Sequence, residues 1–469
     1  MTDFVVRHAP DVSCFDSAAT GLRFHLELRC AGDEILFDVE VENRSGRTRE
    51  WQLAGLVDWL MGTDVTDGSM LRTWSRFGAC FASGTGGVGY FVANDLQARA
   101  GCSKLDFYAG GDMMSPRGLD ALELSQGGWI LQLPLRLRPG EKACRRFALG
   151  GAQSVAAAYA RVRALRAAWP TPPAPQELKL QFETPDERIN LLANGFLQAQ
   201  TRNARIFGRT GLYQPGGAYG FRDQLQDMLP LIHEEPERVR RHLLYCAARQ
   251  FPAGDVLHWW HEPYTGVRTR ISDDLLFLPY VTAQYVRITG DEAVLEDCAP
   301  FLKEVELPKD REDIYAEMQP STECASLHEH CMRAFRRAAD FGDHGLCKMG
   351  SGDWNDGMNR VGAQGRGESV WLSEFLAVCA ADYARIAPNA ADRAWLTALN
   401  ERMCAAVESQ GWDGKWYLRA YADDGRALGS HESRCFRIDA ISQAWAVLAG
   451  LDPARCRSAM NAAWHELVD

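Results

Sequence analysis

The sequence lacks the long apolar and basic runs that mark several classes of protein. No stretch of about 18 consecutive apolar residues is present, which argues against a helix that spans a bilayer. No run of Lys and Arg is present either, and Asp+Glu exceed Lys+Arg by 62 to 51, which argues against a nucleic-acid partner. The first residues, Met1-Thr2-Asp3-Phe4, do not have the basic and apolar regions of a signal peptide. We therefore expect a cytoplasmic protein without a membrane span.

Closely spaced cysteine pairs are absent as well. The 14 cysteines stand singly along the 469 residues, and none forms a C-x-x-C pair. This pattern predicts reduced, mostly buried thiols, because disulfides seldom persist in the cytoplasm. A disordered chain is not expected, because 46% hydrophobic and 24% charged residues are proportions typical of folded soluble proteins. At roughly 100–200 residues per domain, the length predicts two or more domains.

Up to about Gly150 the apolar residues recur with a period of two. In Glu34–Asn43 three apolar residues alternate with acidic ones, which places the apolar side chains on one face of a strand. Leucines alternate with other residues in the same way from Leu131 to Leu137. Glycine-rich turns separate these runs. Residues 1–152 are therefore predicted to form a β-sandwich.

From residue 153 onward the pattern becomes helical. Val155–Ala168 has helical periodicity and leads into the Pro-rich stretch Trp169–Pro175, so 153–180 is predicted to be a helical and Pro-rich linker. The rest, 181–469, is interpreted as about ten helices without intervening strands: 185–202, 222–233, 236–250, 273–289, 293–304, 326–340, 369–386, 390–409, 437–449 and 453–467. A bundle, a solenoid and a closed α/α barrel are the alternatives. The absence of a repeat of about 30–50 residues and the long polar loops favour the barrel.

The first of three polar, aromatic-rich segments is Arg209–Asp227. Several glycines in this segment precede Arg222 and Asp223, which begin a predicted helix. Asp223 and Asp227 are four residues apart, so both carboxylates project from one helical face. These side chains are candidates for binding a polar ligand. The alternative is a solvated helix face with ordinary i,i+4 pairs.

The second segment, His258–Asp274, contains two adjacent tryptophans. Trp259 and Trp260 are candidates for a carbohydrate platform or the wall of a pocket, since aromatic planes stack on sugar C–H faces. The two histidines of this segment are three residues apart, but no third ligand has a matching spacing, so we expect no metal here. Ser272 is interpreted as the cap of the next helix, with two aspartates at its positive end.

The third segment, Gly350–Arg360, places Asp353 and Asp356 around Trp354. A carboxylic acid that protonates a leaving oxygen needs a raised pKa, and packing against an indole supplies this by desolvation. The alternative is a turn-forming or calcium-binding Asp/Asn/Gly loop. Calcium is disfavoured, because the alternate-position ligands and terminal Glu of an EF-hand are missing.

These segments carry a resemblance to a known family. Gly-Ala-Tyr-Gly-Phe-Arg-Asp-Gln-Leu-Gln-Asp (217–227), Trp-Trp-His with Gly-Val-Arg-Thr-Arg-Ile-Ser-Asp-Asp (259–274) and Gly-Asp-Trp-Asn-Asp-Gly-Met-Asn (352–359) resemble, in order, segments of glycoside hydrolase family 94. The family contains cellobiose and chitobiose phosphorylases and the C-terminal region of cyclic β-1,2-glucan synthases. The resemblance implies a carbohydrate-binding type of β-sandwich at 1–152, a linker at 153–180 and an (α/α)6 barrel at 181–469.

The resemblance also implies an activity. Members are glycosyltransferases (hexosyltransferases) that cleave a β-glucosidic bond of a disaccharide or oligoglucan with inorganic phosphate and inversion, giving an α-sugar 1-phosphate. Asp356 matches the general acid, and Arg209 is a phosphate contact. No cofactor or metal is implied beyond phosphate as co-substrate, and relatives are commonly homodimers. The residues that match or suit glucosyl binding are Arg222, Asp223, Asp227, Trp354, Trp259 and Trp260.

The sequence departs from the family pattern near its end. Members continue into a Glu-Asn-Gly-Gly stretch and a phosphate-binding His, whereas this sequence stops at Asp469. We therefore expect an incomplete barrel. Two alternatives to an active phosphorylase follow: an inactive or weakly sugar-binding remnant, and a detached phosphorylase region of a cyclic β-1,2-glucan synthase.

Overall fold

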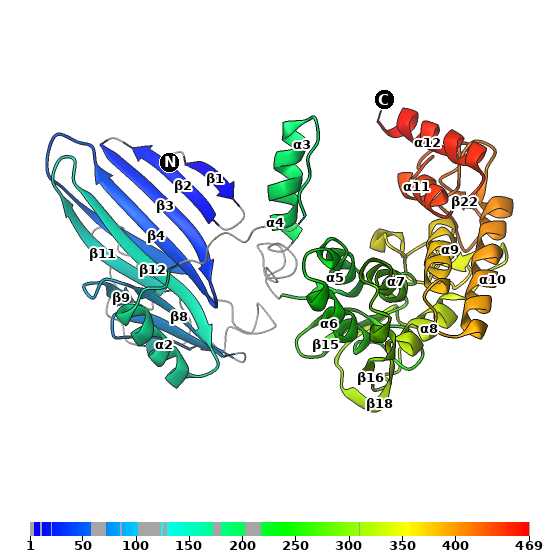
Figure 1. Ribbon diagram of the computed structural model, residues 1–469, viewed down its shortest axis with the longest axis horizontal. Coiled ribbons are helices and arrows are strands. Elements are labelled where there is room, and N and C mark those ends of the chain that lie inside the picture. The colour runs from blue at the N-terminus through cyan, green and yellow to red at the C-terminus, as the bar shows by residue number, and fades with distance from the viewer. Residues whose placement is uncertain are drawn as a thin grey trace. The chain divides into compact units, whose positions relative to one another are not determined.

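The computed structural model describes residues 4–9, 12–19, 21–57, 72–84, 87–101, 123–124, 129–171, 180–201, 217–308 and 310–468. Two compact units are present: the main part of the first is Met1–Gln200, and the main part of the second is Ala218–Asp469 (Figure 1). In the described residues, no helix has both the length and the apolar character needed to cross a bilayer.

The first unit is built from two antiparallel sheets. The larger sheet has nine strands, in the order β1 (Val5–Ala9), β2 (Val12–Ala19), β3 (Leu22–Ala31), β4 (Glu34–Asn43), β12 (Lys142–Ala152), β8 (Gly87–Ala93), β7 (Ala79–Gly84), β6 (Arg72–Arg76) and β10 (Glu123–Leu124). The smaller sheet has three, in the order β5 (Arg49–Val57), β11 (Trp129–Leu137) and β9 (Arg99–Gly101). The alternation of Glu34–Asn43 predicted β4 with the bounds that the structure shows.

An apolar core lies between these sheets. Val39 and Val41 of β4 and Phe91 of β8 pack there against the leucines of β11. The opposite face of the large sheet is covered at one end by helix α2 (Val155–Ala167), whose Val162 and Leu165 are buried against it. Helix α2 lies within the predicted linker 153–180 and packs on the sheet. The unit continues through α3 (Glu187–Leu191), a π-helical turn (Leu192–Phe196) and α4 (Leu197–Thr201).

The second unit contains two rows of helices. The first row is α5 (Phe221–Met228), α7 (Phe277–Thr289), α9 (Val370–Ala384) and α11 (Ala440–Leu448), each in contact with the next. The second row is α6 (Pro236–Ala247), α8 (Leu327–Ala338), α10 (Ala390–Ala406) and α12 (Pro453–Leu467), which pack on the first (Figure 1). Helix α9 lies at the centre and is apolar on most sides, as its buried Phe375 and Leu376 show.

The expectation that no strands separate these helices is wrong. Short strands occupy the loops: β13 (Tyr219–Gly220), β14 (Leu257–His261), β15 (Thr265–Thr269), β16 (Cys298–Leu302), β17 (Asp313–Glu317), β18 (Pro320–Ser326), β19 (Cys347–Lys348), β20 (Glu368–Ser369), β21 (Ala420–Tyr421) and β22 (Ala427–Leu428). The predicted helix 293–304 is half strand, because a short apolar run does not distinguish the two periodicities. Thirteen cysteines are described and all are free, but fewer than half are buried, so the expectation of mostly buried thiols is also wrong.

Candidate active site

Five polar residues of the second unit lie at the N-terminal ends of the first-row helices. Arg222 lies in the first turn of α5, Asp273 and Asp274 precede α7, Ser369 is the N-cap of α9, and Asp439 is the N-cap of α11. Helix N-termini carry partial positive charge, so this end of the array suits carboxylates and anionic ligands.

Arg222 and Asp356 form the centre of the site. The guanidinium of Arg222 is buried, and its Nη2 donates to Asp356 Oδ1 at 2.6 Å, while Nη1 donates to Asp273 Oδ1 at 3.0 Å and to the Asp353 carbonyl at 3.1 Å. One arginine therefore joins α5, the segment before α7 and the loop 350–360. The side chain of Asp356 itself is 56% exposed, so it is the member of this group that an incoming ligand can reach.

His258 lies near the second carboxylate oxygen of Asp356. Its Nδ1 lies 2.7 Å from Asp274 Oδ2, and its Nε2 lies 3.7 Å from Asp356 Oδ2. Burial opposes the charged imidazolium, but the two carboxylates outweigh it and raise the pKa of His258 to about 10. Asp356 consequently faces two positive charges at neutral pH.

The pKa of Asp356 departs from the sequence-based expectation. Partial burial favours the neutral acid, but hydrogen bonds and charge from His258 and Arg222 prevail and lower its pKa to about 2. The pKa of Asp356 is therefore lowered, not raised as the sequence predicts. The indole of Trp354 does not supply a dry pocket, since its side chain is 46% exposed.

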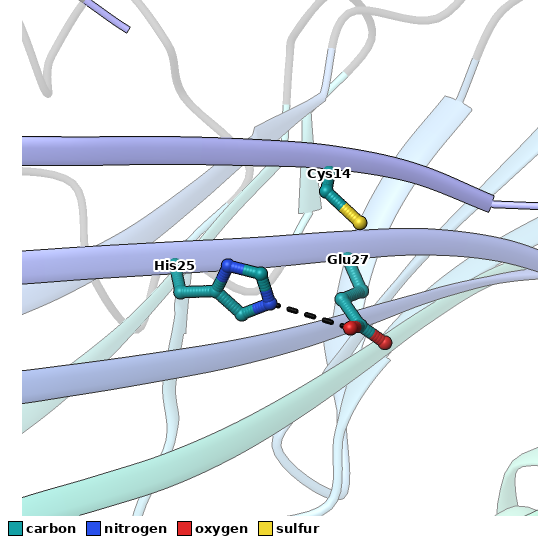
Figure 2. A group of neighbouring side chains, drawn as sticks. All are labelled: Cys14, His25 and Glu27. Carbon is teal, nitrogen blue, oxygen red and sulfur yellow. Dashed lines mark hydrogen bonds and ion pairs between the residues drawn. The ribbon is translucent and has the colours of Figure 1, made fainter. Parts of the chain in front are cut away.

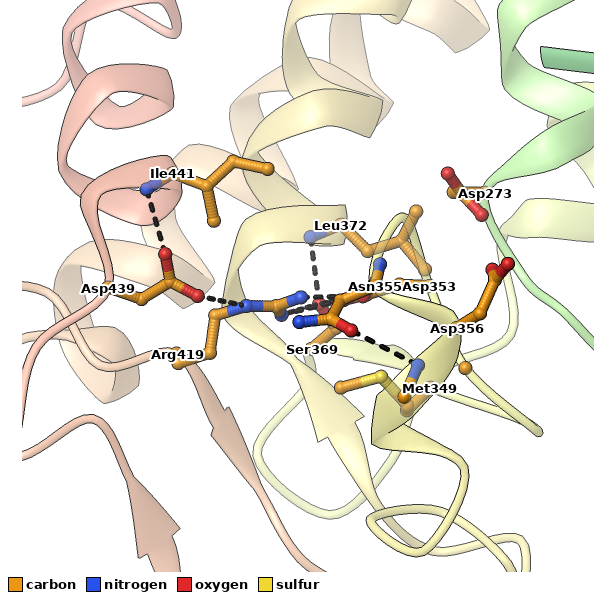
Figure 3. Close-up of polar contacts among 12 residues, drawn as sticks. Asp273, Met349, Asp353, Asn355, Asp356, Ser369, Leu372, Arg419, Asp439 and Ile441 are labelled. Atoms are coloured by element: carbon orange, nitrogen blue, oxygen red, sulfur yellow. Dashed lines mark hydrogen bonds and ion pairs between the residues drawn. The ribbon is translucent and has the colours of Figure 1, made fainter. Parts of the chain in front are cut away.

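Asp353 has a different environment from Asp356, although only two residues separate them in the sequence. It is fully buried and accepts hydrogen bonds from both terminal nitrogens of Arg419, at 2.6 and 2.5 Å, and from Ser369 Oγ at 2.7 Å. Arg419 also donates to Asp439 at 3.1 Å (Figure 3). Asp353 thus anchors the loop to the N-termini of α9 and α11, and holds its own carbonyl in place for Arg222.

Local backbone chemistry explains why the loop 350–360 takes this path. Gly350 has φ +63° and lies so close to the preceding segment that a Cβ would stand 2.1 Å from the Arg270 carbonyl oxygen. Ser272 N donates to the Gly352 carbonyl at 3.0 Å, and Asn355 Oδ1 accepts from Gly357 N at 3.1 Å. The loop is therefore a turn-forming Asx segment pinned to the chain before α7, as the alternative interpretation held, and it also presents Asp356.

A cavity of about 480 Å³ opens beside Asp356 and His258. Trp259 lines it together with Tyr315, their ring centroids 5.6 Å apart, and the lining is completed by Val267, Thr269, Ile271, Glu312, Asp313, Ser351 and Asn359. A cavity of this size with two aromatic rings and several carboxylates suits a ligand rich in hydroxyl groups.

The remaining predicted residues have different outcomes. Trp260 is fully buried, and its Nε1 donates to Tyr245 Oη at 2.9 Å, so its assignment as a pocket wall is wrong: adjacent strand residues face opposite sides, and only Trp259 faces the cavity. Asp223 and Asp227 lie half-buried one turn apart on α5. Arg209 lies outside the described residues.

The interpretation of Ser272 as a helix cap is also wrong. Its Oγ donates to the Met349 carbonyl at 2.8 Å, and the two aspartates after it bind Arg222 and His258 instead of the helix end. Ser369, Arg419 and Tyr315 were not singled out from the sequence. They come from segments with no distinctive spacing, and only the fold brings them to the site.

Comparison with known proteins adds a family to this geometry. Residues 176–469 match the model described as "Glycosyl hydrolase 94 superfamily, catalytic domain". The chain is 42% identical over 297 residues to cyclic beta-(1,2)-glucan synthase NdvB of Rhizobium meliloti (strain 1021), covering 62% of this chain and 10% of that protein. It is 32% identical over 284 residues to solabiose phosphorylase of Paenibacillus borealis, covering 58% and 33% respectively.

Other matches point the same way. The chain is 26% identical over 347 residues to N,N'-diacetylchitobiose phosphorylase of Vibrio proteolyticus, covering 66% of this chain and 40% of that one. It therefore spans between a tenth and less than half of the length of these relatives. A bacterial glucoamylase complexed with acarbose shares the fold with a TM-score of 0.54 at 10% identity, covering 90% of this chain and 61% of that one. The family match spans well over half of the chain, and the chain therefore belongs to the glycosyl hydrolase 94 superfamily.

Proposed function

We propose that the second unit catalyses inverting phosphorolysis of a β-glucosidic bond in a disaccharide or β-glucan, giving α-glucose 1-phosphate, with Asp356 as the general acid. The observation that carries the proposal is the position of Asp356. It is the half-exposed carboxyl at the edge of an aromatic-lined cavity, held by Arg222 and His258. Because phosphate is already a charged nucleophile, one acid suffices, whereas inverting hydrolysis uses a second carboxylate to activate water.

The low pKa of Asp356 makes substrate binding part of this mechanism. A glucosyl unit in the cavity displaces water from the half-exposed carboxyl, which raises its pKa by desolvation. Phosphate bound nearby adds negative charge and competes for the Arg222 guanidinium, which raises it further. Each tenfold gain in the proton affinity of Asp356 requires about 1.4 kcal/mol of binding free energy, so we expect the carboxyl to be ionised in the free site and to gain its proton when sugar and phosphate bind.

The helical rows supply the framework for this chemistry. We infer that α5–α12 belong to an (α/α)6 barrel, with α5, α7, α9 and α11 as its inner helices. Their contacts in chain order and the fold likeness to the glucoamylase support this inference. In such a barrel the converging N-termini of the inner helices face the substrate and favour a phosphate anion. The predicted domain division, homodimer, absence of a cofactor and cytoplasmic location stay predictions.

A β-1,2-linked glucan is the substrate class that we propose. The relative with 42% identity is named for β-(1,2)-glucan synthesis, and its match covers 62% of this chain. This favours the interpretation of the chain as a phosphorylase region of the glucan-synthase type over a cellobiose or chitobiose enzyme.

The test is phosphate-dependent release of glucose 1-phosphate by the purified chain from sophorose, laminaribiose and cellobiose. We expect release from sophorose, and a loss of at least about 100-fold in Asp356→Asn. Asp340→Asn is the matched control, because that side chain is 62% exposed and paired with Lys348 at 2.9 Å but lies outside the cavity. Retained turnover in Asp356→Asn would refute the acid assignment. A folded chain that binds sugar without releasing product would favour the remnant instead.

A further inference from the structure

Three side chains with metal-binding atoms gather on the large sheet of the first unit. Cys14 of β2 pairs across the strands with Glu27 of β3, and Asp16 of β2 pairs with His25 of β3. Residues directly opposite each other in an antiparallel pair project from the same face. The Cys14 thiol, a His25 ring nitrogen and a Glu27 carboxylate oxygen all lie within 4.8 Å of one another (Figure 2). All three residues are half-buried.

Neighbouring charged side chains hold the His25 ring and the Glu27 carboxylate in one orientation. His25 Nδ1 lies 2.8 Å from Asp16 Oδ1, while the other Asp16 oxygen is bound by Arg7. Glu27 Oε2 accepts from Arg29 Nη2 at 3.2 Å. These contacts turn His25 Nε2 and Glu27 Oε1 toward each other, at 3.3 Å, beside Cys14. A carboxylate that orients a histidine through its second nitrogen is the usual support of a metal-bound imidazole.

A proton or a metal ion can satisfy the two facing atoms of His25 and Glu27. When Nδ1–H donates to Asp16, a neutral imidazole presents a lone pair at Nε2, and the Glu27 carboxylate also presents one. Two acceptors at 3.3 Å repel each other unless a proton or a metal ion lies between them. Two ligand atoms at about 2.0–2.2 Å from a tetrahedral zinc ion are separated by about 3.3–3.5 Å, so the spacing already fits.

We propose that Cys14, His25 Nε2 and Glu27 Oε1 bind a zinc ion on this face of the sheet, with water as the fourth ligand. Thiolate, imidazole and carboxylate are the three donor types that zinc takes in proteins, and the thiolate and carboxylate together balance its charge. The site lies in the first unit and is independent of the phosphorolysis proposed for the second. Asp16 acts as a positioning residue for the imidazole.

The test is titration of the full chain with Zn²⁺ by calorimetry, and with Co²⁺ by absorption spectroscopy. We expect the wild-type chain to bind one equivalent of Zn²⁺ more than Cys14→Ser, and to show a thiolate-to-cobalt charge-transfer band that this variant lacks. Cys144→Ser is the matched control, because Cys144 is an exposed thiol of the same sheet outside the cluster. It should retain both the stoichiometry and the band.

A second variant separates metal binding from a folding defect. Asp16→Asn keeps all three ligands, and we expect it to weaken Zn²⁺ binding by about 10-fold or more, because the imidazole loses its orienting carboxylate. Equal Zn²⁺ stoichiometry in the wild type and Cys14→Ser would overturn the proposal. So would a cobalt spectrum without thiolate bands in the wild-type chain.

Discussion

Replacing Asp353 by Asn should destabilise the second unit more than any change to a surface ion pair. The substitution keeps the size of the side chain but removes its charge. Arg419, which is 1% exposed, then keeps a buried positive charge and loses its main carboxylate partner. Removing one member of a buried ion pair costs about 3–5 kcal/mol. The remaining amide oxygen still accepts one hydrogen bond and Asp439 still contacts Arg419, so we expect about 3 kcal/mol.

The assay is urea unfolding, with Glu466→Gln as the control. Glu466 pairs with Arg437 at 3.1 Å on the surface of the same unit, where such pairs contribute about 0–1 kcal/mol. In a double-mutant cycle, Asp353→Asn and Arg419→Met together should cost clearly less than the sum of the single changes. A loss below about 1 kcal/mol for Asp353→Asn, or strict additivity in the cycle, would show that the pair does not hold the loop in place.

Further predictions concern the histidine, the tight turn and the exposed indole. The pKa of His258 is raised to about 10 in the folded protein. The stabilisation that its charge supplies is therefore complete below the ordinary pKa of 6.5 and is lost as the pH rises through 10. In thermal melts, the wild type should lose more stability than His258→Gln between pH 7 and pH 10. Gly350→Ala places a Cβ 2.1 Å from a backbone oxygen and should lower the free energy of unfolding in urea by more than about 2 kcal/mol. Gly365 also has a positive φ, +78°, but no atom lies within 4 Å of its Cβ position, so Gly365→Ala should cost only about 1 kcal/mol. Equal losses for the two variants would show that the close approach at Gly350 does not matter. Trp354→Ala should weaken sugar binding in calorimetry. The melting temperature should stay unchanged, because Trp354 is 46% exposed. A lowered melting temperature would show that the Trp354 ring stabilises the fold by packing.

The regular parts of the fold were predictable from local patterns. Alternation of apolar and acidic residues predicted β4, and the helix predicted at 453–467 has the bounds of α12, where the Asp452 side chain accepts from Ala454 N. The short strands of the second unit were missed, because two to seven residues give no measurable period. Strand β15 pairs with β17, and the two strands are separated by more than 40 residues, so no local pattern indicates the pairing.

The sequence indicated which segments form the site but not the contacts between their side chains. Asp356 and Arg222 stood out because several polar groups crowd a short loop and a helix start. Their contact at 2.6 Å joins residues 134 positions apart, and no spacing in the sequence encodes it. The same holds for the low pKa of Asp356, which is set by His258 and Arg222 from other segments. The Cys14 cluster was missed for a related reason, since its ligands meet through strand register.

If Asp356 protonates the leaving oxygen, its loss should matter only for substrates whose leaving group needs that proton. Phosphorolysis by the wild type and Asp356→Asn should be compared on sophorose and on an aryl β-glucoside whose phenolate leaves without protonation. We expect Asp356→Asn to lose about 100-fold or more in phosphorolysis of sophorose and much less in phosphorolysis of the aryl glucoside. Equal losses on both substrates, or undiminished turnover of sophorose, would contradict this role of Asp356.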